Sequence, residues 1–323
     1  MLSGLAILLA LTCCVEKSTA QTPPADLSFD VKAPFRFVVY GDARFHDPTD
    51  TEAANPQVRT LLVQGIADAD PSFICFGGDL VFNGYDADDW KVWDAETRLW
   101  RDRKITVYPS LGNHEVRGDM DAGLTNYFRQ FPHLGGNRYY SVRAANTLLL
   151  VLDSQQDELT GPQGQWLNDR LDHVPAEVNF VFLMFHHPPY TSSIESGNHS
   201  GGHSARPQEQ ALARMLEERQ VHAPYRFVVF SSHVHNYERH EHGGITYFVS
   251  GGGGAHASPV ERAPDDPYQS KELNYHYLLV EVDHHELMIT MNRVDVTTGK
   301  AVWTKPDSVK IIVPAAAAAA ASH

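Results

Sequence analysis

Cysteine is scarce in this chain: only three of its 323 residues are Cys. Two of them, Cys13 and Cys14, end an N-terminal apolar run that we expect to be removed. Cys75 is then the one cysteine left, in the apolar stretch "SFICF". An intrachain disulfide is therefore excluded, and a buried thiol is the simplest interpretation of Cys75.

Positive charge is also in short supply. The chain has 26 Lys and Arg against 40 Asp and Glu, which gives a formal net charge of -14. No basic stripe offsets the repulsion that a polyphosphate backbone would meet, so we expect no nucleic-acid partner. An anionic substrate would need a local positive site.

Long apolar runs are absent. The run at the start, "MLSGLAILLALTCC", is too short to span a bilayer comfortably. The small residues "STA" before Gln21 are typical of a signal-peptidase site, although no Lys or Arg precedes the run. We therefore predict a signal peptide over 1–20 and a secreted or periplasmic protein. The alternative is a lipoprotein signal, and lipidation at Cys13 or Cys14 is the route by which we would expect a membrane association.

The remaining chain predicts one domain. Residues 21–34 are polar and Pro-rich, as expected of a linker, and 313–323 are an Ala-rich, low-complexity tail. Between them, 35–312 contain neither an internal repeat nor a second strong linker. Strand-like and helix-like runs alternate up to the segment "YRFVVFSSHVH", and strands joined by turns follow it. This βαβ order predicts an α/β fold with a further antiparallel part.

Polar side chains follow five of the strand-like runs. They are Asp42 after "FRFVVYG", Asp79 after "SFICFGG", Asn113 and His114 after "ITVYPSLG", His186 and His187 after "VNFVFLMF", and His233 and His235 after "YRFVVFSS". In an open α/β sheet the carboxyl ends of parallel strands meet at one edge. His233 and His235 would also share a face of an extended chain. Together these positions predict a metal site, whereas any one of them alone is better explained as a structural turn or a polar cluster.

At this point the sequence resembles the calcineurin-like metallophosphoesterases, and most closely their purple acid phosphatase branch. The blocks "GDAR", "GGDLVF", "GNHE", "HHPPY" and "SHVHNYER" follow the order of the family's five signatures. The resemblance implies a four-layer αββα sandwich with two metal ions at the strand ends.

The resemblance also implies the metal ligands. Asp79 would bridge both metals, since two cations about 3.5 to 4 Å apart need an anion between them. Asp42 and His235 would bind the first metal, and Asn113, His186 and His233 the second. Pro188 favours His186 over His187 in the family's His-x-Pro block, which leaves His187 as a neighbour. Such ligands suit Zn, Mn or Fe about equally, so we predict two divalent ions without choosing among them.

Other residues are assigned to the reaction. His114 would donate a proton to the leaving oxygen or hold a phosphoryl oxygen. Arg44 would contact a substrate phosphate, with an ion pair to an acidic residue as its alternative role. His199 and His203, in a Gly- and Ser-rich stretch, are weaker candidates for substrate contact.

Two positions depart from the family. Arg44 replaces its usual His, and Phe82 replaces the Tyr ligand of the purple branch, so a residue such as His46 would have to complete the first site. The expected function is hydrolysis of small phosphomonoesters, in which the metals activate a bound water. The alternatives are a phosphodiesterase of the same fold and a non-catalytic metal-binding member. Oligomeric state is not encoded in these motifs.

Overall fold

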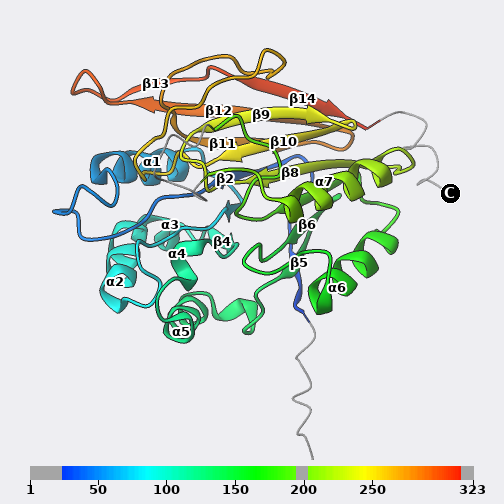
Figure 1. The fold of residues 1–323 in the computed structure, drawn as a ribbon, viewed down its shortest axis with the longest axis horizontal. Helices are drawn as coiled ribbons and strands as arrows, with labels where there is room; N and C mark the ends of the chain where they lie inside the picture. Colours follow the sequence, from blue (N-terminus) through cyan, green and yellow to red (C-terminus); the bar gives the residue numbers. More distant parts are fainter. Residues whose placement is uncertain (1–23, 194–202, 314–323) are drawn as a thin grey trace, which may run out of the picture.

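The computed structural model describes residues 24–193 and 203–313. Within these ranges the chain forms two seven-stranded sheets that pack face to face, with helices on both outer sides (Figure 1). The predicted α/β class and four-layer αββα arrangement are confirmed. The predicted signal peptide, the Ala-rich tail and His199 lie outside the described residues.

The first of these sheets, sheet I, contains a parallel block. Strands β6, β7, β8 and β10 run parallel in it, while β5 and β9 are antiparallel to their neighbours β6 and β10. Across the sheet the order is β1 (Asp26–Phe29), β5 (Tyr140–Ala144), β6 (Thr147–Val151), β7 (Phe180–Met184), β8 (Arg226–Ser231), β10 (Ile245–Ser250) and β9 (Tyr237–His242).

The second sheet, sheet II, joins a parallel and an antiparallel part. Strands β2, β3 and β4 are parallel, and the C-terminal strands extend the sheet in antiparallel fashion from β2. The order is β13 (Val302–Thr304), β12 (Glu286–Asp295), β11 (Tyr275–Val282), β2 (Phe35–Tyr40), β3 (Phe73–Phe76) and β4 (Thr106–Pro109), and β14 (Ser308–Ile312) also pairs with β12.

The helices lie in two groups on opposite sides of the sheets (Figure 1). One group is α1 (Pro56–Asp68), α2 (Ala87–Glu96), α3 (Arg98–Asp102), α4 (Asn113–Val116) and α5 (Met120–Gln130), with the 3-10 turn Pro132–Leu134 after it. The other is α6 (Gly161–Asp172) and α7 (Pro207–Gln220). No helix within the ranges that the structure describes is both long enough and apolar enough to cross a bilayer.

Successive side chains of a strand point to opposite faces of its sheet, and this alternation builds the layers. In β7, Phe182 points between the sheets, where its ring lies 5.2 Å from that of Phe37 in β2. The next residue, Leu183, packs on the opposite face with leucines of α6 and α7. In β2, Tyr40 turns to the helix side and meets Trp100 of α3 at 6.1 Å. Each central strand is therefore apolar on both faces, as strands buried on both sides of an α/β sheet must be.

The N-terminal segment differs from the sequence-based prediction. Residues 26–29, within the predicted linker, form β1 and pair in parallel with β5. Leu27 and Phe29 pack against the main core, while Asp26 and Ser28 alternate with them. A pattern of two apolar residues is too short to predict a strand from the sequence. The segment is a strand because it pairs with β5.

Two buried carboxyl groups interact at the start of α7. Glu158, in the loop after β6, and Glu209, in the first turn of α7, are both fully buried, and Arg206 binds Glu209. Burial and the neighbouring Glu209 charge raise the pKa of Glu158 to about 9. The folded chain thus keeps a proton that the unfolded chain, with a Glu pKa of about 4.3, has already released.

The Glu158→Gln variant tests this pair. Between these two pKa values the wild-type free energy of unfolding should fall by up to about 1.4 kcal/mol per pH unit because of Glu158, and the glutamine removes that contribution. Urea unfolding at pH 5 and pH 8 should therefore give similar stabilities at pH 5 and a more stable variant at pH 8. Glu261→Gln, at an exposed position, is the control. A wild-type-like loss of stability between the two pH values in Glu158→Gln would contradict the assignment.

Candidate metal centre

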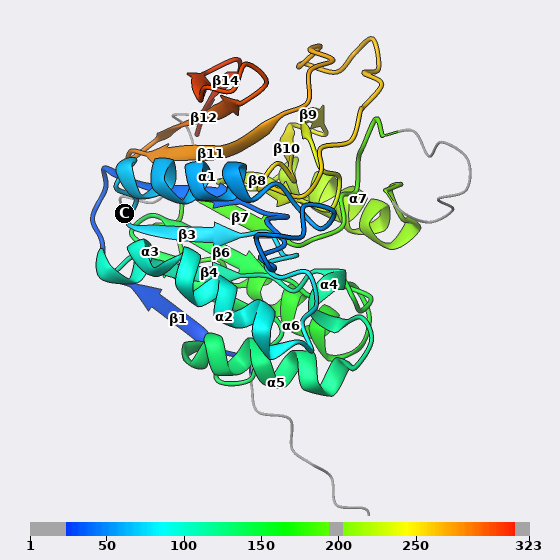
Figure 2. The same ribbon diagram turned by 90° about the vertical axis from the view of Figure 1, so that its left-hand side faces the viewer.

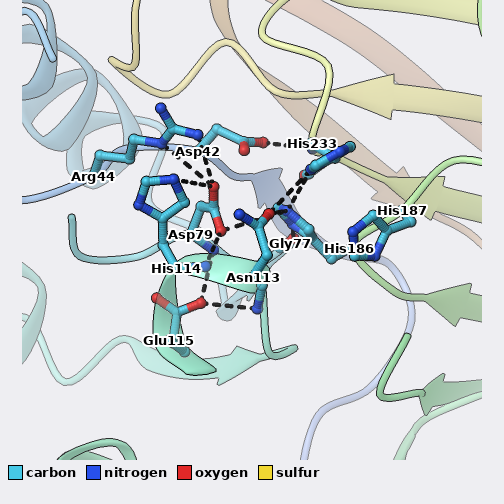
Figure 3. Close-up of polar contacts among 12 residues, drawn as sticks. Asp42, Arg44, Gly77, Asp79, Asn113, His114, Glu115, His186, His187 and His233 are labelled. Atoms are coloured by element: carbon cyan, nitrogen blue, oxygen red, sulfur yellow. Dashed lines mark hydrogen bonds and ion pairs between the residues drawn. The ribbon is translucent and has the colours of Figure 1, made fainter. Parts of the chain in front are cut away.

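The ligands implied by the resemblance converge between the two sheets. They follow β2, β3 and β4 of sheet II and β7 and β8 of sheet I, at the edge toward which the β3 arrow points in Figure 2. The side chains labelled in Figure 3 meet in one cluster, and His235 Nε2 lies 3.8 Å from Asp42 Oδ1. The structure thus brings together Asp42, Asp79, Asn113, His186, His233 and His235, all of them buried except the half-buried Asn113.

Two glycines allow the sheets to approach here. A Cβ added at Gly41 would lie 2.2 Å from the hydroxyl oxygen of Ser232, and one at Gly77 would lie 2.1 Å from it. Neither distance is tolerated by a side chain. Because Ser232 precedes His233, these two glycines, each of which closely precedes one of the aspartates, let the histidine segment reach both of them.

The three atoms expected to bind the second metal lie close together. Asn113 Oδ1 lies 3.0 Å from His186 Nε2 and 3.1 Å from His233 Nδ1, and these two nitrogens are 3.0 Å apart. His186 Nδ1 donates to the carbonyl of Gly77 at 2.9 Å, which leaves the Nε2 lone pair for a metal. One amide oxygen and two imidazoles in this arrangement fit a divalent transition metal.

Two ligand atoms of the first site have no hydrogen-bond partner among the described residues. They are Asp42 Oδ1 and His235 Nε2, which are buried and lie 3.8 Å apart. His235 Nδ1 donates to the carbonyl of His256 at 3.0 Å, so its Nε2 carries a lone pair. A carboxylate oxygen and an imidazole nitrogen left unpaired in a buried place cost free energy unless a cation joins them. The first site therefore also fits a metal ion.

Asp79 lies between the two sets of ligands. Its Oδ1 is 3.4 Å from His186 Nε2, and its Oδ2 accepts a hydrogen bond from Arg44 Nη2 at 3.1 Å. Burial opposes its ionisation, yet His114, His186 and Arg44 together hold the pKa of Asp79 well below its usual range. Burial and the Asp79 charge raise the pKa of Asp42 well above its usual range. A cation bound between these two carboxylates would offset the repulsion between their charges.

The backbone at the ligands is unusual. Asp42, Asp79 and His233 have φ values of 58°, 54° and 70°, in the left-handed region that non-glycine residues seldom adopt. Strand β8 ends at Ser231, so His233 and His235 reach the centre from a turn. The expectation that they share one face of an extended strand is wrong, because the left-handed His233 redirects the chain. Strain of this kind is typical of functional sites.

Glu115 is a positioning residue that sequence reasoning missed. Its fully buried carboxylate accepts backbone N–H groups of Gly112, Asp79 and Leu80 at 2.8 to 2.9 Å. Burial and the charge of Asp79 raise the pKa of Glu115 to about 8. These bonds fix the loop that presents Asp79 relative to the helix that presents Asn113. The only signal in the sequence was an acidic residue beside two candidate site residues.

His114 lies beside Asp79 with a defined tautomer. Its Nδ1 donates to the carbonyl of Phe82 at 2.7 Å, and its Nε2 lies 3.6 Å from Asp79 Oδ2. Nε2 also accepts from Arg117 at 3.3 Å. Burial, against the attraction of Asp79, lowers the pKa of His114 to about 4. The imidazole is thus neutral at pH 7, and its Nε2 lone pair accepts the hydrogen bond from Arg117.

The other candidate histidines differ in placement. His187 is close to His186 and His233 and bonds through Nδ1 to Ser154 at 2.9 Å. The ring of His203 lies 5.2 Å from that of His233 and 5.0 Å from that of His235.

His46 and Arg44 both engage carboxylates. The two ring nitrogens of His46 contact Asp89 at 2.5 Å and Asp50 at 3.2 Å, so its expected role as a first-site ligand gains no support. Arg44 contacts Asp79, as its alternative ion-pair role predicted.

The layered fold and this set of carboxylate, amide and imidazole donors define the class of the metallophosphoesterases. Residues 35–237 match the family model of the calcineurin-like phosphoesterases. The match covers more than half of the chain, so the chain belongs to the calcineurin-like phosphoesterase family, and the resemblance to its purple acid phosphatase branch is confirmed.

Named relatives are plant phosphatases. The chain is 28% identical over 195 residues to a phosphoenolpyruvate phosphatase of Allium cepa, a match that spans 55% of this chain and 38% of the relative. It is 28% identical over 185 residues to the Fe(3+)-Zn(2+) purple acid phosphatase 12 of Arabidopsis thaliana, which spans 52% of this chain and 37% of that protein.

The fold resembles the purple acid phosphatase PPD1 from Lupinus luteus seeds with a TM-score of 0.69. The two chains are 18% identical, and the likeness covers 89% of this chain and 55% of the lupin protein. The chain therefore spans less than two fifths of the length of the two curated relatives and about half of the lupin structure.

The protein loaded with iron is expected to be colourless or nearly so. The purple colour of the branch arises from a tyrosinate ligand to ferric iron, and a phenyl ring at Phe82 has no oxygen to offer. The hydroxyl of Tyr40, close before Asp42 in the chain, donates to the carbonyl of Gly253 at 3.0 Å, and burial raises its pKa. A visible spectrum of the iron-loaded protein checks this. An intense band in the middle of the visible range would show that another tyrosine reaches the metal.

Proposed function

We propose that the protein is a metal-dependent phosphomonoesterase that acts on small phosphorylated substrates. The observation that carries this proposal is the pair of unpaired atoms, Asp42 Oδ1 and His235 Nε2, beside the Asn113, His186 and His233 cluster, with Asp79 between them. Family membership and the names of the matched relatives support phosphate ester chemistry.

Each residue then has a defined task. Asp42, Asp79 and His235 would hold one metal, and Asp79, Asn113, His186 and His233 the other. Two bound cations would supply an activated water and offset the charge of the phosphoryl group. His114 presents Nε2 beside Asp79, where a bound phosphate anion raises its pKa and lets it protonate the leaving oxygen. Arg44 donates two N–H groups toward the same place, at Asp79 Oδ2.

We further propose that residues 1–20 are a signal peptide and that the mature enzyme, with its catalytic domain over 35–312, acts outside the cytoplasm. The apolar N-terminal run and the small residues before Gln21 support this. Mass determination of the protein exported by a host cell tests it, since cleavage after Ala20 gives one defined mass and lipidation at Cys13 or Cys14 another.

One assay separates the candidate functions. Metal content per chain is measured together with turnover of p-nitrophenyl phosphate and of bis-p-nitrophenyl phosphate. We expect two metal ions and faster turnover of the monoester. Faster turnover of the diester would make the protein a phosphodiesterase. Bound metal without turnover of either compound would make it a non-catalytic binding protein.

The Arg44→Ala variant is expected chiefly to raise KM for phosphomonoesters. The guanidinium is 16% exposed at its side chain and donates along the edge of Asp79, so it can reach a phosphate oxygen bound there in both ground and transition states. Steady-state kinetics with metal analysis check this, and Arg98→Ala on the exposed face of α3 is the control. Kinetics equal to those of the wild type would leave Arg44 with its ion pair alone.

A further inference from the structure

Arg117 is a charged residue next to the site that the proposed chemistry does not use. It follows α4, three positions after His114, and it is half-buried. Its Nη2 donates to Asn83 Oδ1 at 2.7 Å, and its Nη1 donates to His114 Nε2 at 3.3 Å. Among the residues that the structure describes, no carboxylate forms an ion pair with it.

The arginine is held in place by neutral groups. Its guanidinium carbon lies 4.4 Å from the centre of the Phe82 ring, a cation–π contact at the position where the purple branch has its tyrosine ligand. An amide, an imidazole and a phenyl ring orient the guanidinium without neutralising it. In a chain with a net charge of -14, a half-buried arginine without a carboxylate partner presents donors for an anion from outside.

The position of Arg117 relative to His114 indicates which part of a substrate it meets. His114 Nε2 lies 3.6 Å from Asp79 Oδ2 and accepts a hydrogen bond from Arg117 Nη1 at 3.3 Å, so it contacts both a proposed metal ligand and the arginine. A phosphoryl group at the metals would meet Arg44 and His114 first. Because His114 faces the leaving oxygen, the next group along the substrate belongs to the leaving group.

We propose that Arg117, oriented by Phe82 and Asn83, binds a second anionic group on the leaving-group side of the substrate. The substrate is then a phosphomonoester or diphosphate whose leaving group bears a carboxylate or a further phosphoryl group. This inference rests on the proposed function, and it adds a specificity residue that neither the five sequence blocks nor the metal ligands include. Arg117 would also stabilise the negative charge that the leaving group gains as its bond to phosphorus breaks.

Calorimetric titration of the metal-loaded protein with three non-hydrolysable compounds tests the subsite without relying on turnover. Methylphosphonate carries one anionic group, methylenediphosphonate adds a phosphoryl group, and phosphonoacetate adds a carboxylate. Arg117→Ala should weaken binding of at least one of the last two by about 10- to 100-fold, the effect of losing a charge-assisted hydrogen bond, and should weaken methylphosphonate several-fold less. Arg117→Lys should restore part of the loss.

The pattern identifies the second group and separates this inference from the proposed function. If Arg117→Ala weakens only the binding of phosphonoacetate, the second group of the substrate is a carboxylate. If it weakens only the binding of methylenediphosphonate, the second group is a phosphoryl group. If it weakens the binding of both compounds, the subsite accepts either anion. Equal weakening of all three compounds by Arg117→Ala, or of none, overturns the subsite even if p-nitrophenyl phosphate is hydrolysed. Selective weakening in a protein that hydrolyses nothing supports the subsite and refutes the phosphatase. Metal analysis of each variant and the Arg98→Ala control exclude metal loss and a general charge effect as causes.

Discussion

The Asp79→Asn variant is expected to lose at least about 10³-fold in kcat/KM, because the residue proposed to bind both metals loses the charge that offsets their repulsion. It should also bind less metal at both sites. Asp79 is fully buried, faces His186 through one oxygen and Arg44 through the other, and stays ionised at neutral pH. Asparagine keeps the shape and removes the charge.

Stability provides a readout independent of turnover. Metal binding to the folded wild type should raise its Tm, whereas Asp79→Asn should show a much smaller rise. Without metal the variant should be less stable than the wild type at neutral pH, because the low pKa of Asp79 shows that its charge, paired with Arg44, stabilises the folded chain. Asp265→Asn, at an exposed position, is the matched control. Full metal occupancy in Asp79→Asn, measured by elemental analysis, would refute the bridging role.

The His114→Ala variant is expected to keep its metals and to lose about 10²- to 10⁴-fold in kcat, the usual scale of general acid catalysis. The imidazole does not belong to either set of proposed ligands, and its Nδ1 is anchored on the Phe82 carbonyl. It must gain a proton to act as an acid. Burial lowers its pKa to about 4 in the free protein, so protonation has to accompany binding of the phosphate anion.

The pH dependence distinguishes an acid from a structural residue. A required protonated imidazole makes the wild-type kcat fall as pH rises through the pKa of His114 in the substrate complex, and that fall should disappear in His114→Ala. The exposed His173→Ala serves as control. Metal loss with unchanged residual kcat, or an unaltered pH profile, would make His114 structural.

The sequence predicted that these side chains converge because each follows an apolar strand, and the carboxyl ends of parallel strands lie at one edge of a sheet. Asp42 and Asp79 are recognisable from "FRFVVYGD" and "SFICFGGD" for this reason, and their left-handed φ values change only how they enter the site. The alternation of helix-like with strand-like runs was also predicted, and α1, α6 and α7 each have a proline in their first turn.

Features that depend on tertiary contact were not predictable. Strand β1 exists because β5 offers it a partner, and the turn at His233 exists because Gly41 and Gly77 leave room for Ser232. The roles of Glu115 and Arg117 depend on which backbone groups and rings lie beside them in space. No local pattern in "GNHEVR" separates a carboxylate that binds three or more backbone amides from one that faces solvent.

The proposed metals would act as cross-links between distant parts of the chain. Asn113 and His233, both assigned to the second metal, are separated by 120 positions and follow strands of different sheets. A covalent cross-link that closes a loop of about 100 residues is worth roughly 5 kcal/mol in chain entropy, and a metal held from both sheets constrains the chain in the same way. Removing the metals with a chelator should thus increase amide hydrogen exchange in β2, β3, β7 and β8 together, far beyond the residues that touch the ions. In this protein the metal ions proposed for catalysis would also hold the two sheets together.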